Sequence, residues 1–141
     1  MKAIKNIRLD DYDYSSDGYY FVTIVTDYKK PYLIDHHDLV KEAIINLKKY
    51  YGVGIDYYVV MRNHLHIILI LEDCRHKLGE IVRRLKAATS KVSGIKLWQP
   101  NYYEHIIRNE RALRKIREYI INNPLVERLE FEQFYKGDGK S

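Results

Sequence analysis

Two apolar segments separated by only two residues constrain the fold of this chain most strongly. Residues 55–61 and 64–71 are rich in aliphatic and β-branched side chains, and Arg62 and Asn63 lie between them. Such segments around a two-residue turn predict an antiparallel hairpin, in which Asn63 would tolerate a left-handed conformation. The second segment is apolar at both alternating sets of positions after its start, which is typical of a central strand covered on both faces. We therefore expect a sheet built around residues 64–71.

The other elements place this hairpin inside an alternating order of strands and helices. We expect a strand over 19–26, a helix from 35 or 36 to about 51, the hairpin strands 55–61 and 64–71, a basic amphipathic helix over about 78–90, a short strand near 102–107 and a helix over 110–122. Asn109 can cap the last helix, and Pro124 stops it. This order predicts an α+β fold: a ferredoxin-like βαββαβ antiparallel sheet with an additional C-terminal helix. Because that fold hosts many functions, the chemistry has to come from individual residues.

The length and composition are those of one small domain. We expect residues 1–141 to form a single domain, with a peripheral tail from about residue 131. No segment is both long and apolar enough to cross a bilayer, and the start carries no apolar signal segment. The single cysteine, Cys74, excludes an intramolecular disulfide. A cytoplasmic protein without membrane association is the simplest interpretation.

Positive charge is concentrated in one segment of the chain. The net charge is +5, and residues 74–96 contain seven basic residues against one acidic residue, Glu80. A concentrated basic stripe is typical of a surface that binds a polyanion such as nucleic acid. The candidates for contacts to a DNA backbone are Arg83, Arg84, Lys86, Lys91 and Lys96. A solvated helix face would have the same composition, so charge alone leaves both interpretations open.

Two histidines, His64 and His66, stand at the start of the second hairpin strand. Residues two apart on a strand point to the same face, so both rings can approach one metal ion. Neutral imidazole is the commonest metal ligand in proteins. A His-x-His pair on an apolar strand is nevertheless often incidental, and the spacing alone does not decide between the two.

The last predicted helix places a tyrosine at the edge of its apolar stripe. Leu113, Ile116 and Ile120 form the stripe, Tyr119 lies beside it, and Asn123 follows Tyr119 by one turn on the same flank. The ring of Tyr119 could therefore be packed while its hydroxyl faces a cleft. A tyrosine at the rim of the core beside a helix-terminating asparagine would have the same pattern.

The neighbouring residues resemble those of a known family. Residues 58–69, with the Asn63-His64-Leu65-His66 core, resemble the histidine–hydrophobe–histidine signature of the single-tyrosine transposases of the HUH superfamily. Arg62 stands where members usually have proline, which should loosen the turn without removing a ligand. Residues 98–108 and 116–124 look like the C-terminal signature of the REP-associated tyrosine transposases, a bacterial branch of that superfamily, and residues 7–23 are similar to its opening.

The resemblance implies a function and a set of site residues. It implies that Tyr119 is the nucleophile, that His64, His66 and Asn123 hold Mg²⁺ or Mn²⁺, and that the partner is single-stranded or hairpin DNA. The implied enzyme cleaves DNA at hairpin-forming repeats and rejoins it through a 5′-phosphotyrosine, as a monomer or homodimer. The alternatives are a nucleic-acid-binding module without catalytic activity and a metal-dependent phosphoesterase that uses water.

Overall fold

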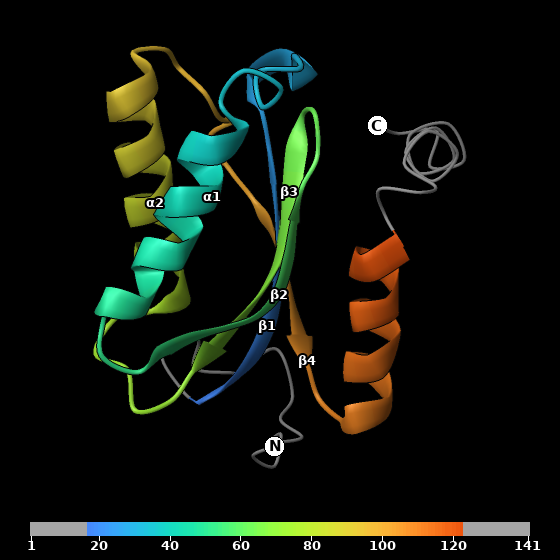
Figure 1. Cartoon of the computed structure of the whole chain (residues 1–141). Helices are drawn as coiled ribbons and strands as arrows, with labels where there is room; N and C mark the ends of the chain where they lie inside the picture. Colours follow the sequence, from blue (N-terminus) through green and yellow to red (C-terminus); the bar gives the residue numbers. More distant parts are fainter. Residues whose placement is uncertain (1–16, 123–141) are drawn as a thin grey trace.

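A four-stranded antiparallel sheet is the centre of the molecule (Figure 1). The computed structural model describes residues 17–122. The strands are β1 (Gly18–Val25), β2 (Val53–Val60), β3 (His64–Leu71) and β4 (Tyr103–Ile107), and they lie in the order β2-β3-β1-β4. β1 pairs with both β3 and β4, and β3 pairs with β2. This is the order expected of a ferredoxin-like sheet, and the predicted fold class is confirmed.

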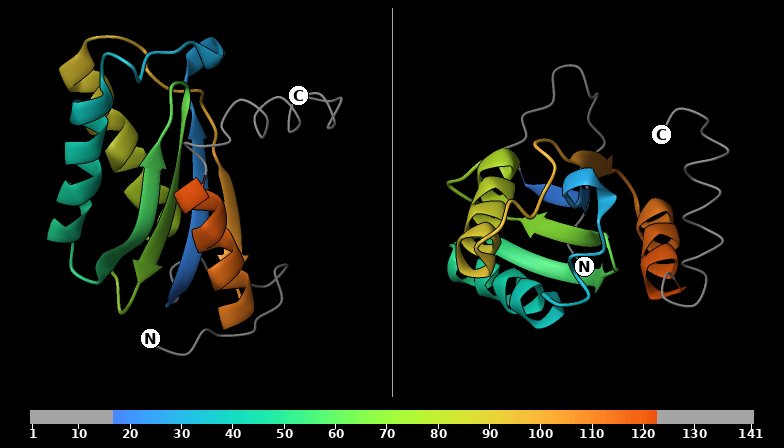
Figure 2. Two further views of the ribbon diagram at one scale, coloured as in Figure 1. Left: turned by 45° about the vertical axis from the view of Figure 1, so that its right-hand side comes forward. Right: turned by 90° about the horizontal axis from the view of Figure 1, so that it is seen from above.

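Helices cover both faces of the sheet. α1 (His37–Asn46) and α2 (Leu78–Ser93) lie on one face, and the helix of residues 110–122 lies on the other (Figure 2). The pleat of β1 separates two clusters: Tyr20 and Val22 join the core under α1 and α2, whereas Tyr19 and Phe21 pack with the helix of residues 110–122. β3 is buried along nearly its whole length, as predicted for a central strand.

The hairpin between β2 and β3 differs from the prediction in its turn. β2 ends at Val60, one residue earlier than expected, and the Met61 amide donates to the carbonyl of His64 at 2.8 Å. The predicted left-handed conformation of Asn63 is wrong. Within residues 17–122 the non-glycine residues with positive φ are Tyr28, Lys29 and Asp73, and Asn63 is not one of them. Asn63 is instead held by tertiary contacts, since its carbonyl accepts from the Thr26 amide at 2.9 Å.

The helix ends follow from local residue chemistry. α2 runs three residues further than predicted and ends at Ser93; Gly94, which follows, adopts the left-handed conformation that glycine favours after a helix. The side-chain oxygen of Asn109 accepts a hydrogen bond from the Ala112 amide at 2.9 Å, so the predicted cap is confirmed. Pro124 and the tail from residue 131 lie outside the described residues. No helix within residues 17–122 is long and apolar enough to cross a membrane.

Candidate active site

His64 and His66 lie side by side on the sheet face that the helix of residues 110–122 covers. β1 aligns Thr23 opposite His66 and Val25 opposite His64. The two imidazole rings have their centroids 4.8 Å apart, and each residue keeps only 6% of its surface exposed. The predicted shared face is confirmed, because alternation along β3 sends both side chains to the same side.

Tyr119, on the helix of residues 110–122, approaches the two histidines from the helix layer that covers this face of the sheet. Its ring centroid lies 5.2 Å from that of His66, with the two rings steeply inclined at 65°. Phe21 of β1 packs against both, at 5.4 Å from His66 and 6.4 Å from Tyr119. The structure therefore brings together three of the residues singled out in the sequence, from a strand and a distant helix. Asn123, the fourth, lies outside the described residues.

Asn63 determines which nitrogen of His64 carries its proton. The side-chain NH₂ of Asn63 donates to the carbonyl of Lys29 at 3.2 Å, and its side-chain oxygen lies 2.9 Å from Nδ1 of His64. The carbonyl oxygen of Lys29 can only accept a hydrogen bond, so the NH₂ of Asn63 faces Lys29. The side-chain oxygen of Asn63 therefore faces His64. Nδ1 of His64 is therefore the donor, and its lone pair lies on Nε2. This role of Asn63 was missed in the sequence, where the residue was interpreted as part of a turn.

His66 has one nitrogen bonded and one without a partner. Its Nδ1 lies 2.8 Å from the hydroxyl oxygen of Thr23, across the β1–β3 pairing. Its Nε2 is buried, and no hydrogen-bond partner for it exists among residues 17–122. Burial, with a smaller contribution from the neighbouring His64, lowers the pKa of His66 from its ordinary 6.5 to about 3. His66 is therefore a neutral imidazole at physiological pH.

These features fit a divalent cation. A buried polar atom without a partner costs about 1–3 kcal/mol, and a metal ion would satisfy Nε2 of His66. Both histidines have their Nδ1 engaged by a side chain, the arrangement that orients metal-binding imidazoles. Residues 17–122 contain no group of three His, Cys, Asp or Glu side chains that could hold a metal. The pair therefore offers at most two nitrogen ligands, and amide oxygen, water or substrate would have to complete the shell.

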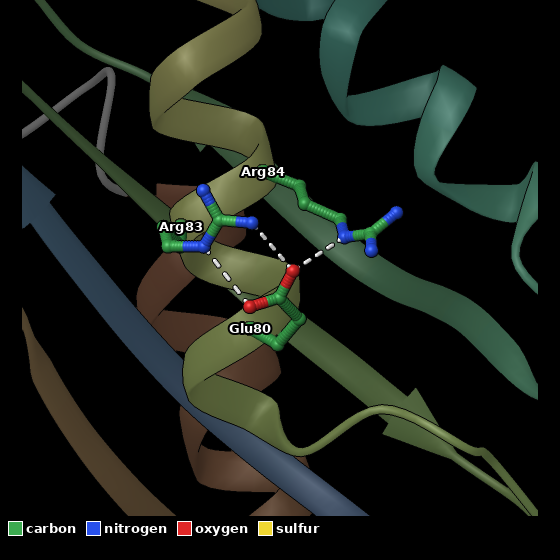
Figure 3. A network of polar contacts seen from close by, with 3 residues as sticks. All are labelled: Glu80, Arg83 and Arg84. Atoms are coloured by element: carbon green, nitrogen blue, oxygen red, sulfur yellow. Dashed lines mark hydrogen bonds and ion pairs between the residues drawn. The ribbon is translucent and has the colours of Figure 1, made fainter.

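Arg83 and Arg84 of α2 lie on the opposite face of the sheet and already have a protein partner. Glu80 sits between Arg83 and Arg84 and accepts hydrogen bonds of 2.6 to 3.0 Å from them (Figure 3). These bonds lower the pKa of Glu80 to about 2, so this carboxylate stays ionised. The structure thus separates the predicted DNA-contact residues of α2 from His64 and Tyr119 by the thickness of the sheet.

Lys86 is bound to backbone atoms of the protein, whereas Lys91 and Lys96 are exposed. The Lys86 ammonium donates to three successive carbonyls, of Gln99, Pro100 and Asn101, at 2.8, 3.1 and 2.9 Å. Burial lowers the pKa of Lys86. Lys91 and Lys96 point to solvent. Charge patterning in the sequence could not separate these cases, because the partners of Lys86 are backbone atoms beyond the end of α2.

Comparisons with known proteins place the chain in a family and support its fold. The family model described as "Transposase IS200 like" matches residues 14–123. A Haemophilus influenzae protein without an assigned function is 37% identical, over 86% of this chain and 88% of its own length. The REP-associated tyrosine transposase of Escherichia coli K12 is 29% identical, over 79% of this chain and 69% of its own length.

A solved structure shares the fold as well. The structure of a REP-associated tyrosine transposase bound to a REP hairpin superposes with a TM-score of 0.71 and 26% identity, covering 86% of this chain and 73% of that one. With the family model matching most of the sequence, the chain belongs to the IS200-like transposase family. The resemblance to REP-associated tyrosine transposases that the sequence motifs indicated is confirmed.

Proposed function

We propose that this chain cleaves single-stranded DNA at hairpin-forming repeats and rejoins it, with Tyr119 as the nucleophile. The observation that carries the proposal is the convergence of Tyr119 on the His64–His66 pair, with the rings of Tyr119 and His66 5.2 Å apart. Membership of a transposase family supports DNA cleavage and transfer as the reaction class. The relative bound to a REP hairpin supports hairpin DNA as the partner.

The proposed reaction exchanges one phosphodiester for another. The hydroxyl oxygen of Tyr119 attacks phosphorus, the bond from phosphorus to the 3′ oxygen breaks, and the 3′ oxygen leaves as a hydroxyl after taking up a proton. The DNA is then joined to the enzyme as a 5′-phosphotyrosine. Attack of a 3′-hydroxyl on that linkage restores a DNA backbone and releases Tyr119. Because the covalent intermediate conserves the phosphodiester, the exchange needs no nucleoside triphosphate as an energy source.

His64 and His66 are proposed to hold Mg²⁺ or Mn²⁺ through their Nε2 atoms, with Asn123 as a third ligand. A bound cation would offset the negative charge of the phosphodiester and of its transition state. The chain itself contributes the orientation of the imidazoles, through Asn63 and Thr23, and the burial that keeps His66 neutral. Phe21 packs against the rings of both His66 and Tyr119 and limits the space around them.

DNA contacts are proposed for the basic residues on and after α2. Arg83, Arg84, Lys86, Lys91 and Lys96 remain the candidates; Arg83, Lys91 and Lys96 are exposed, whereas Arg84 and Lys86 are half-buried. Since α2 and Tyr119 lie on opposite faces of the sheet, DNA that contacts both must pass around an edge of the sheet. Tyr119 and the histidine pair come from one chain in this arrangement, so we propose that a single copy supplies the site.

The direct test is formation of a covalent adduct. Labelled single-stranded DNA with a hairpin from the flanks of the gene is incubated with the protein and Mn²⁺, then resolved on a denaturing protein gel. We expect a metal-dependent adduct that disappears in Tyr119→Phe and persists in Tyr103→Phe, a matched change at a tyrosine on β4 that is 65% exposed. Cleavage without an adduct would replace the proposal with hydrolysis by water. Tight binding without cleavage would indicate a module that only binds DNA.

A further inference from the structure

An ion pair at the edge of the sheet ties the Tyr119 helix to β2. Arg117 donates two hydrogen bonds to Asp56, from Nε to Oδ1 at 2.9 Å and from Nη2 to Oδ2 at 2.5 Å. The side chain of Asp56 is only 5% exposed and that of Arg117 is 31% exposed. Two parallel hydrogen bonds between a guanidinium and a carboxylate fix the relative orientation of both groups as well as their separation.

An irregularity in β2 belongs to this arrangement. The pairing of β2 with β3 shifts register between Ile55 and Tyr58, so Asp56 and Tyr57 lie in the bulged part of the strand. A bulge re-aims side chains that regular pairing would direct elsewhere. The guanidinium of Arg117 also lies over the ring of Tyr57, 5.5 Å from its centroid. Arg117 is therefore held by two adjacent residues of the bulge, through two different interactions.

The ion pair and the chain connection anchor the helix at opposite edges of the sheet. The helix of residues 110–122 follows β4, which is one edge strand, whereas Asp56 is on β2, the other edge strand. Between these anchors the helix packs through Leu113 and Ile120, which are buried, and Ile116. Apolar packing is not directional, so it leaves small shifts and rotations of a helix less constrained than a bidentate ion pair does.

Tyr119 depends on this geometry because it lies only two residues after Arg117. A shift of the helix along or about its axis would move the Tyr119 ring away from the ring of His66, which it approaches at 5.2 Å. We propose that Asp56 and Arg117 are positioning residues, whose ion pair fixes the helix of residues 110–122 on the sheet and so holds Tyr119 beside His66. The inference rests on the proposed role of Tyr119 as the nucleophile.

The test compares Asp56→Asn with Asp38→Asn, the same chemical change at a fully exposed carboxylate on α1. The measured quantities are the single-turnover rate of adduct formation, the affinity for hairpin DNA, and amide hydrogen exchange along the chain. For Asp56→Asn we expect a loss of adduct rate of about tenfold or more, since misplacement by about 1 Å can cost about 100-fold. We also expect faster exchange over residues 110–122, with unchanged exchange in α2 and unchanged DNA affinity. Asp38→Asn should match the wild type in all three.

Arg117→Lys provides a second, milder variant. It keeps the positive charge but loses the planar two-pronged interaction, so its adduct rate should fall between those of the wild type and Asp56→Asn. Unchanged exchange over residues 110–122 in both variants would overturn the proposal, whatever the adduct rate. If exchange in α2 became faster to the same extent as over residues 110–122, the proposal would also be overturned, because the ion pair would then stabilise the whole fold. Hydrogen exchange reports on the helix even if the wild type forms no adduct, so failure of the proposed function remains distinguishable.

Discussion

Acid should destabilise this protein through one buried imidazole. The pKa of His66 is lowered from 6.5 to about 3 in the folded chain, whereas the unfolded chain takes up the proton near pH 6.5. Between these two pH values the unfolded state binds more protons than the folded state. The free energy of unfolding therefore rises with pH in this window, and the contribution of His66 is lost as the pH falls below 6.5.

The magnitude follows from this difference in proton binding. Between pH 7.5 and pH 5, uptake of a proton by the unfolded chain alone lowers the free energy of unfolding by about 2 kcal/mol. That figure depends on the unfolded pKa and hardly changes if the folded pKa is 3 or 4, because both lie below the range of the measurement. About 2 kcal/mol is a large fraction of the stability of a small domain.

Urea unfolding at both pH values, with EDTA present, measures this effect against His66→Gln. Glutamine is polar, but it does not titrate in this range. The wild type should lose about 2 kcal/mol more than the variant between pH 7.5 and pH 5. Parallel losses in the two proteins would refute the reasoning, because His66 would then take up its proton equally in the folded and unfolded states.

Two further predictions concern the metal and the DNA. Asn63→Ala should lower the affinity for Mn²⁺ about 10- to 100-fold by calorimetry, since it releases the Nδ1 proton of His64 from its acceptor; equal affinity in Asn63→Ala and the wild type would contradict the assigned tautomer. Alanine at Arg83 and Arg84 should weaken hairpin binding and reduce its salt dependence by a slope of about 1 for each phosphate that the protein no longer neutralises. An unchanged salt slope would show that these arginines serve only Glu80 and the helix.

Local patterns were sufficient to predict the sheet and the histidine pair. The alternation of β3 directs His64 and His66 to one face, and the short connection before His64 requires a hairpin whatever its turn geometry. The cap at Asn109 is likewise an interaction between residues three apart. Features of this kind are encoded within a few neighbouring residues.

The rest of the site depends on contacts between distant segments. Asn63 was interpreted as a left-handed turn residue because its partner, the carbonyl of Lys29, lies 34 residues away in sequence. Asp56 and Arg117 are 61 residues apart, and the one available signal was an acidic residue within an otherwise apolar strand. The approach of Tyr119 to His66 followed from family resemblance rather than from helix periodicity, which specifies a buried flank but not the surface it packs against.

The charge of α2 illustrates a different limit. Counting basic residues from 74 to 96 correctly identified a positive segment, but the count cannot show that Glu80 bridges Arg83 and Arg84. Nor can it show that Lys86 is used to hold the segment after α2. A side chain that already has a structural partner must give up part of that interaction to bind phosphate, so sequence charge overstates the available surface.

The most direct test of the central claim is to locate the DNA on the protein by mass spectrometry. Trypsin should release residues 118–128, in which Tyr119 is the single tyrosine. After reaction with hairpin DNA and nuclease trimming, that peptide should carry the mass of a 5′-linked nucleotide at Tyr119. A nucleotide on any other of the fourteen tyrosines, or cleaved DNA with every tyrosine unmodified, would contradict Tyr119 as the nucleophile.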